Sequence, residues 1–416
     1  MTNQEKYNQK LKRFQDAIAM KEPDCVPMIP FVQTYNITRY GHTMAEIMYD
    51  VSGAKDAVKK YLDEYDPDVN YGYGSLFAGM GPIWEKAGLK FLQWAGEKGS
   101  VCTENSIHQF VEKPYLKQEE YSDILTDFTG WVMKKYLPRN YTSMEALQDM
   151  DFANMLGYSS FPGLIQFGNP EIVKMFETLA EIAGGVSENF RESSEFDAEM
   201  RRYGYPTLFS GSATVSFDIL SDCLRGTLGT MEDLYEVPEE VEEMLRRFYP
   251  ASLKNCLSQA AAGENLVVFI PLHKGLDGFM GTEQYRRFYW PTLKLLVEDL
   301  TAHNLIPYIY TEGKYDSRLD FLRELPAGKV LVHFENCDMK KAKKIVGDHC
   351  CITGGFSSRL LAAGSPETVE EEVKKLLDLC APGGGYMFDL DMTIDDGAKP
   401  ENVEAMFRAV RKYGVY

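Results

Sequence analysis

The sequence predicts a (β/α)8 barrel, in which eight parallel strands alternate with helices. Residues 306–339 read as a strand, a short helix and a second strand, and both strands are continuous apolar runs, as in parallel sheets covered on both faces. The same alternation resumes after residue 206 and continues to residue 413. Several strands end on acidic or imidazole side chains, and the active sites of such barrels lie where the strands end.

The first part of the chain supplies two of the eight strands. Residues 3–20 have apolar residues at helical spacing and predict an amphipathic helix. The apolar run 26–31, flanked by prolines, is interpreted as the first strand. A helical pattern over 43–65 then leads to a second strand within 66–75, which runs into a glycine-rich loop.

Residues 79–206 interrupt the alternation. A connection of more than 120 residues between two strands far exceeds the usual loop of a few residues, and excursions of this kind commonly form lids over sites. We interpret it as an insertion between strands two and three that acts as a lid. The alternative is an insertion that only packs sideways. Helices are predicted at 119–137, 143–156 and 169–190.

The rest of the chain completes the barrel. Strands are predicted at 207–217, 266–272, 306–310, 330–334, 350–353 and 386–390. Helices are predicted at 231–262, 283–303, 317–325, 340–346, 366–380 and 400–413. We expect residues 1–416 to form a single barrel domain that begins with a helix over 1–22.

Charge and composition exclude several classes of partner. The chain has 62 acidic and 44 basic residues and a net charge of -18, which argues against nucleic acid and anionic membranes. No run approaches ~18 apolar residues and the N-terminus is polar, so we expect neither a spanning helix nor a signal peptide, and a cytoplasmic location. The 8 cysteines lack framework spacing, which predicts reduced thiols.

Candidate site residues follow the strands. They are Asp218, His273 with Lys274, Glu312, Glu335 with Asp338, and Asp389 with Asp391. A strand period of two places Tyr310 with Glu312 and His333 with Glu335 on shared faces. Crowded carboxyl groups raise one another's pKa or bind a cation, so the set predicts proton donors or a metal site. A core histidine and, for Asp338, a helix N-cap are the structural alternatives.

Stretches across residues 23–416 match one known superfamily in order. They include WAGEKG, QFVEKPYL, YLPR, SFDILSDCLRGTLG, HKGLDGFMG, YRRFYWPTLK, EGKYDSRL, LPAGKV, NCDMKKAK and ITGGFSSRLLAAGSPETV. The chain resembles the uroporphyrinogen decarboxylase-like barrels, in particular their corrinoid-dependent branch. Within that branch it is most similar to the methyltransferase I proteins of anaerobic O-demethylase systems.

The resemblance implies an enzyme that passes a methyl group from a small methoxylated, aromatic donor to Co(I) of a corrinoid. The chain lacks an Asp-x-His-x-x-Gly corrinoid segment, so the corrinoid is expected on a partner protein. A homodimer is also implied. The decarboxylase's arginine-rich first strand is missing, with Arg39 the only arginine nearby. The thiol-methylating relatives' zinc positions read Tyr310, Glu312 and Met392 here, so their thiolate site is absent.

Roles for individual residues follow from strand-end position together with the resemblance. We expect catalytic roles for Glu312, His273, Asp338 and Asp391, with Glu312 as the proton donor and His273 as its partner. We expect Tyr310, Glu335, His333, Asp218 and Trp94 to bind substrate. A bound zinc would use His273, Glu312 and Glu335. The alternatives are a cofactor-independent or metal-assisted lyase that decarboxylates a small organic acid, and a ligand-binding barrel without catalysis.

Overall fold

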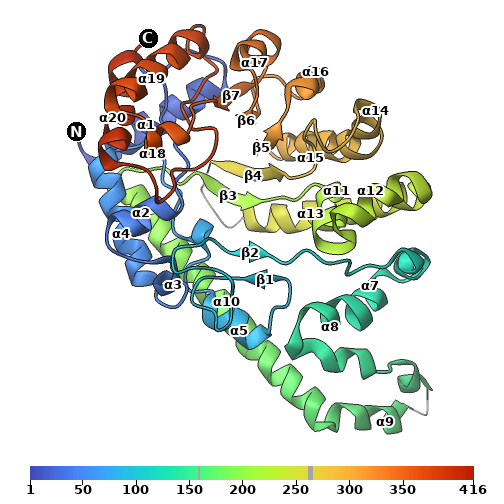
Figure 1. Cartoon of the computed structure of the whole chain (residues 1–416). Helices are drawn as coiled ribbons and strands as arrows, with labels where there is room; N and C mark the ends of the chain where they lie inside the picture. The colour runs from blue at the N-terminus through green and yellow to red at the C-terminus, as the bar shows by residue number, and fades with distance from the viewer. Residues whose placement is uncertain (158–159, 261–265) are drawn as a thin grey trace.

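The computed structural model describes residues 1–157, 160–260 and 266–416. Its central sheet contains five parallel strands that neighbour one another in chain order (Figure 1). They are β3 (Phe209–Ser212), β4 (Val267–Leu272), β5 (Ile306–Lys314), β6 (Leu331–Asn336) and β7 (Cys351–Gly354). Strands four to seven form where the sequence predicted them. The third was predicted over 207–217, but it ends at Ser212, and a helix begins at Ser216.

Three further segments join the sheet edges into a ring. Parallel bridges link Met28 to Phe388, Asn70 to Thr207 and Ile352 to Tyr386. The backbone N–H of Asp68 donates to the carbonyl of Met28 at 2.8 Å, which connects the first two segments. Eight segments are thus hydrogen-bonded in sequence, with the eighth beside the first, and the (β/α)8 fold is confirmed.

The first, second and eighth segments form bridges where the sequence predicted regular strands. Pro27 and Pro30 have no N–H to donate to a ladder. Side-chain carboxylates also take the place of backbone acceptors: Asp68 accepts from Met28 N–H at 2.7 Å and Asp389 from Phe31 N–H at 2.9 Å. The segments therefore lie in barrel positions without continuous strand pairing.

The helices cover the outside of the barrel. In chain order they are α1 (Asn3–Ile18), α2 (Thr34–Arg39), α3 (Met44–Ile47), α4 (Val51–Tyr65), α11 (Ser216–Leu220), α12 (Gly226–Glu236), α13 (Pro238–Ala260), α14 (Thr282–Gln284), α15 (Trp290–Ala302), α16 (Leu319–Leu322), α17 (Met339–Val346), α18 (Arg359–Ala363), α19 (Pro366–Cys380) and α20 (Pro400–Tyr413). Helix α1 begins with a capping box between Thr2 and Glu5 and buries Phe14 and Ile18, as the helical spacing predicted. No described helix is long and apolar enough to span a bilayer.

The excursion between the second and third segments forms an arm beside the barrel (Figure 1). It contains α5 (Gly81–Ala87), the hairpin β1 (Leu92–Gln93) and β2 (Gln109–Phe110), α6 (Tyr121–Thr126), α7 (Phe128–Trp131), α8 (Leu137–Asn140), α9 (Ser160–Gly163) and the long α10 (Pro170–Tyr203). The helix predicted at 119–137 is broken into α6, α7 and a π-turn, and the one at 143–156 starts as 3-10 helix, Thr142–Asp149. The lid role stays a prediction.

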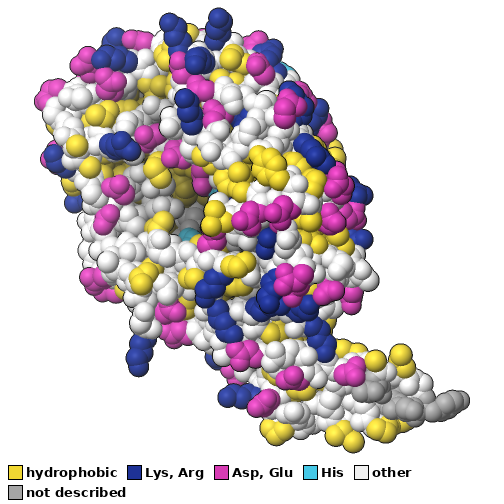
Figure 2. Space-filling model, turned by 45° about the vertical axis from the view of Figure 1, so that its right-hand side comes forward, with side chains coloured by type: hydrophobic (Ala, Val, Ile, Leu, Met, Phe, Trp, Pro, Cys, Tyr) yellow, Lys and Arg dark blue, Asp and Glu magenta, His cyan; other side chains and the backbone are white. Residues whose placement is uncertain are grey.

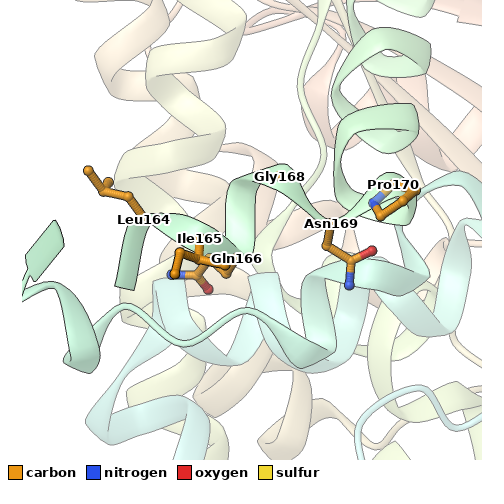
Figure 3. Close-up of a pocket in the computed structure, with 6 residues that line it drawn as sticks. All are labelled: Leu164, Ile165, Gln166, Gly168, Asn169 and Pro170. Atoms are coloured by element: carbon orange, nitrogen blue, oxygen red, sulfur yellow. The ribbon is translucent and has the colours of Figure 1, made fainter. Parts of the chain in front are cut away.

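The arm carries an open depression of about 660 Å³. It is lined by Leu164, Ile165, Gln166, Gly168, Asn169 and Pro170, whose side chains point in different directions along the turn into α10 (Figure 3). None of these residues can carry a proton or hold a metal ion by a charged side chain. The depression is therefore a poor candidate for catalysis, in contrast to the ends of the barrel strands.

The inside of the barrel is filled in tiers, because alternate residues of each strand point inward. The lowest tier is mainly apolar and contains Ile29, Val69, Leu208, Val267, Leu331, Cys351 and Met387, with Tyr308 of β5 beside them. Above it, β4 contributes Phe269 and then His273, and β5 contributes Tyr310 and then Glu312. The interior thus changes from apolar to aromatic to ionisable toward the carboxyl ends of the strands.

Candidate active site at the strand ends

The ionisable tier lies at the carboxyl ends of β4, β5, β6 and the eighth segment. Figure 2 turns this side of the molecule forward and shows a hollow with acidic side chains around it. The Nε2 of His273 is 3.7 Å from Oε1 of Glu312, and Oε2 of Glu335 accepts the N–H of Gly313 at 2.5 Å. The structure therefore brings together Glu312, His273 and Glu335, as strand-end reasoning predicted.

His273 is held by a carboxylate that the sequence analysis did not single out. Its Nδ1 lies 2.5 Å from Oδ2 of Asp222. Burial alone would lower the pKa of His273, but the hydrogen bond to Asp222 and the charges of Asp218 and Glu312 outweigh it and raise the pKa to about 9. The imidazolium then donates from Nδ1 to Asp222, and its Nε2–H faces Glu312.

Asp222 follows Asp218 by one helical turn, a spacing that places both carboxyl groups on one side of a helix. Between them α11 passes into a π-turn, Ser221–Arg225, which shifts the register of the following side chains. Lys274 also contacts Asp222, with its ammonium 3.3 Å from Oδ1. The spacing of four residues from Asp218 could have marked Asp222 as a second carboxylate on the same side of the helix. The π-turn that directs Asp222 to His273 is not visible in the sequence.

Asp218 lies beneath the site and is fully buried. It accepts the Tyr289 hydroxyl at 2.7 Å and the backbone N–H groups of His273 and Lys274 at 3.2 and 3.1 Å. Burial raises the pKa of Asp218 to about 7, although His273 and these donors oppose the shift. Asp218 thus fixes the loop after β4 and leaves no accessible carboxylate for a substrate.

Replacing Asp218 with alanine is expected to reduce the free energy of unfolding by about 3 kcal/mol, because one buried and two partly buried donors lose their acceptor, and an unsatisfied buried donor costs about 1–3 kcal/mol. Urea unfolding measures the change. Asp218→Asn keeps one acceptor oxygen and should lose less. Equal stability of wild type and Asp218→Ala would contradict the assigned role.

Glu312 is the half-buried carboxyl group of the site, with 42% of its side chain exposed. Burial raises its pKa, His273 lowers it, and the charges of Glu335 and Asp222 raise it further, so the net direction is upward. A carboxyl group with a raised pKa beside an imidazolium is suited to deliver a proton. The acid role of Glu312 stays a prediction, with burial favouring its protonated form and His273 opposing it.

Tyr310 and His333 form a stacked pair on neighbouring strands, with ring centroids 3.9 Å apart and an interplanar angle of 5°. Burial lowers the pKa of His333 to about 4, so its ring is neutral. Its Nε2–H donates to the carbonyl of Leu390 at 2.8 Å, and Nδ1 has no partner among the described residues. His333 therefore supports Tyr310 and cannot supply a proton near neutral pH.

Two further predicted residues, Asp391 and Asp338, have different surroundings. Asp391 is half-buried, and its Oδ1 accepts the N–H groups of Ser358 and Met392, each at 2.8 Å. Asp338 is exposed and caps α17, with Oδ1 accepting from Lys340 and Lys341. Asp338 is thus a helix N-cap, which is the structural role named as the alternative to a functional one.

Trp94 is only 1% exposed and packs edge-on against Trp84, with ring centroids 5.2 Å apart. Its indole N–H donates to the Tyr49 hydroxyl at 3.3 Å. Both tryptophans belong to a small hydrophobic cluster of the arm, separate from the barrel core. The substrate-binding role expected of Trp94 is corrected accordingly: a fully packed indole has no surface to offer a ligand.

Asp338→Ala is expected to destabilise the protein by about 1 kcal/mol, the usual loss for an N-cap. The rate of catalysis should be unchanged, because the carboxylate is exposed and directed at the helix N-terminus. Thermal unfolding and initial rates, measured on the same preparation, test both statements. A large loss of rate without a loss of stability would restore the catalytic assignment.

The proposed zinc ligands do not fit a metal ion as they lie. Among the described residues no group of three or more His, Cys, Asp or Glu side chains is placed to hold one. Glu335 is turned to the N–H of Gly313, and His273 presents to Glu312 the nitrogen that would have to bind zinc without its proton. We therefore derive no step of catalysis through zinc.

Comparison with known proteins identifies what the chain is similar to. The sequence model of the uroporphyrinogen decarboxylase (URO-D) family matches residues 202–413. The uroporphyrinogen decarboxylase of Methylococcus capsulatus is 27% identical over 183 residues, covering 43% of this chain and 51% of that protein. That of Saccharophagus degradans is 25% identical over 246 residues, covering 58% and 66%.

The chain spans about half the length of the curated relatives it matches first, 51% and 48% of them. A solved structure, a methyltransferase from Methanosarcina mazei, aligns with a TM-score of 0.61 over 96% of this chain and 98% of its own. The two sequences are 15% identical, so the likeness shows the fold. It extends over the arm as well as the part of the chain that the family model matches.

Proposed function

The chain belongs to the uroporphyrinogen decarboxylase family, and from this premise we propose that it is a methyltransferase acting on a small methoxylated donor. The acceptor is Co(I) of a corrinoid carried by a partner protein. The observation that carries the proposal is the pair of His273 and Glu312, 3.7 Å apart at the strand ends, which can protonate a departing oxygen. The similar fold of a protein named methyltransferase supports it.

The first barrel segment disfavours porphyrinogen decarboxylation. Arg39, the arginine nearest to it in sequence, ends α2 and pairs with Glu64 at 3.1 Å. The side chain is 36% exposed and engaged away from the strand ends. A substrate with several carboxylates would therefore meet Glu312 and Glu335, and Arg39 would not offer it a guanidinium there.

The residues of this chain bind the methyl donor and supply the proton that its leaving oxygen takes up. The corrinoid, when its carrier docks, supplies the nucleophile that accepts the methyl group. As the carbon–oxygen bond breaks, its electron pair stays on the oxygen, which takes a proton from His273 Nε2 or from Glu312. General acid help of this kind is worth about 10² to 10⁴ in rate. Before the transfer, Asp222 keeps the imidazole protonated and oriented.

An anaerobic assay tests the function. The purified protein, a methoxylated aromatic donor and a Co(I) corrinoid protein should lose the Co(I) absorbance and release one demethylated product for each corrinoid converted. Prior chelation should leave the rate unchanged, and a loss of activity would bring back the zinc hypothesis. Release of CO2 from small acids, without methyl transfer, would favour the lyase alternative that the names of the curated relatives support.

A further inference from the structure

We propose that the methyl donor is a methoxylated aromatic compound that also carries a protonated amine. The inference rests on the proposed function and names the substrate class of the same site. Two observations carry it: a closed ring of aromatic side chains inside the barrel, and two carboxylates beside it that no cationic side chain of the described residues neutralises.

The aromatic ring set consists of Phe31, Tyr71, Phe209, Phe269 and Tyr310, contributed by five consecutive barrel segments. Neighbouring ring centroids are 4.9, 5.3, 4.8 and 5.5 Å apart in that order, and Tyr310 closes the circle against Phe31 at 6.1 Å. Three of the five retain 7–8% of their surface, and the other two are half-buried. The set forms an apolar floor below the ionisable tier, on which a planar ring can stack.

Glu335 and Asp391 stand on the side of the barrel that this aromatic set leaves open. One oxygen of each is bound to backbone N–H groups, as described above. The second oxygen of each, Oε1 of Glu335 and Oδ2 of Asp391, has no hydrogen-bond or ion-pair partner within the described part of the chain. Partly buried carboxylates without a counter-charge in the protein attract a cationic group of a ligand.

The basic residues near the site do not supply that charge. The ammonium of Lys274 is 3.3 Å from Asp222 and 3.1 Å from the hydroxyl of Thr227, on the opposite side from Asp391 in the order of barrel segments. His273 is bound to the same Asp222. A protonated amine of the ligand therefore provides the charge that Glu335 and Asp391 lack.

The Tyr310 hydroxyl lies between the aromatic set and the carboxylates of Glu335 and Asp391. Tyr310 is 7% exposed, and its hydroxyl has no hydrogen-bond partner among the residues described. Burial, followed by the charges of Asp389, Glu312, Glu335 and Asp391, raises its pKa, so it stays protonated. An unpartnered O–H at the tip of a side chain that is 7% exposed, close to all of these carboxylates, faces the place where a polar ligand group would lie.

These groups define a pose with three contacts. The donor's ring lies on the aromatic set, its methoxy oxygen meets His273 and Glu312, and its amine makes charge-assisted hydrogen bonds to Glu335 and Asp391. A carboxylate at the position of the amine would face two negative groups. The site therefore selects against methoxylated benzoates and phenylalkanoates by repulsion as well as by attraction to the amine.

Calorimetric titration with three matched ligands tests the charge requirement without corrinoid. A methoxyphenyl-ethylamine should bind on the order of tenfold to a hundredfold more tightly than the matching methoxyphenyl-ethanol, and the methoxyphenyl-propanoate should bind least. Glu335→Gln with Asp391→Asn keeps the acceptors for the backbone N–H groups and should abolish the preference. Glu371→Gln, which removes an exposed charge on α19, is the control and should retain it.

Equal affinity for the three ligands, or a preference that survives the double substitution, would overturn the inference. Thermal unfolding of the double variant, compared with the wild type, establishes that it is folded. Amine-selective binding without methyl transfer to Co(I) would support the recognition and overturn the proposed function. Demethylation of the propanoate at the same rate as the amine would support the proposed methyl transfer and overturn the amine selectivity.

Discussion

Replacing Glu312 with glutamine is expected to reduce the rate of methyl transfer by about 10² to 10⁴. The amide has nearly the same shape but cannot give a proton to the leaving oxygen or to His273, which is 3.7 Å away. The loss should appear in the rate constant of methyl transfer measured under single-turnover conditions, as a slower decay of the Co(I) absorbance. Donor binding rests mainly on other side chains, so its affinity should change much less.

The stability of Glu312→Gln should equal that of the wild type. The side chain is 42% exposed, and none of the hydrogen bonds in the described part of the chain uses its carboxyl oxygens. A parallel fall in unfolding temperature and rate would indicate a structural role. An unchanged rate would exclude Glu312 as the acid and leave His273 as the remaining donor.

Much of the barrel could be predicted from the sequence because its inner strands obey simple periodicities. The runs that became β4, β5 and β6 are apolar on both faces, which sets them apart from helices of similar length. Helix α20, Pro400–Tyr413, begins at its proline and ends before Gly414, as the end signals indicate. Period-two counting placed Glu312 on the face of Tyr310 and Glu335 on the face of His333, and the structure turns both faces toward the site.

Other features depend on contacts that no local pattern records. In the first barrel segment, the N–H groups of Met28 and Phe31 donate to side-chain carboxylates instead of a neighbouring strand. Asp68 lies 40 residues from Met28 in sequence, and Asp389 lies 358 residues from Phe31. Asp222 reaches His273 because a π-turn rotates it after α11. Trp94 is an aromatic residue in a glycine-rich loop, and only packing against Trp84 shows that it is core. Tertiary contacts thus determined the parts that sequence reasoning missed.

Substituting Asp222 with asparagine should move the alkaline limit of activity to lower pH. Burial lowers the pKa of His273, and the hydrogen bond to Asp222 contributes most to reversing that effect and raising it to about 9. A proton donor is active below its pKa, so wild-type activity should persist up to about pH 9 and fall above it. Without the Asp222 charge the limit should fall by about one to three pH units.

The dependence of kcat/KM on pH separates this role from simple support of the fold. At pH 6 the imidazole of Asp222→Asn is still partly protonated, and much of the activity should be recovered there, whereas a misfolded variant would be inactive at every pH. His273→Gln serves as the control, because it should remove the alkaline limit set by His273 and leave a low rate whose own limit is set by Glu312. If Asp222→Asn keeps the wild-type profile, the proton does not come from His273, and the hydrogen bond at 2.5 Å serves only to fix the loop after β4.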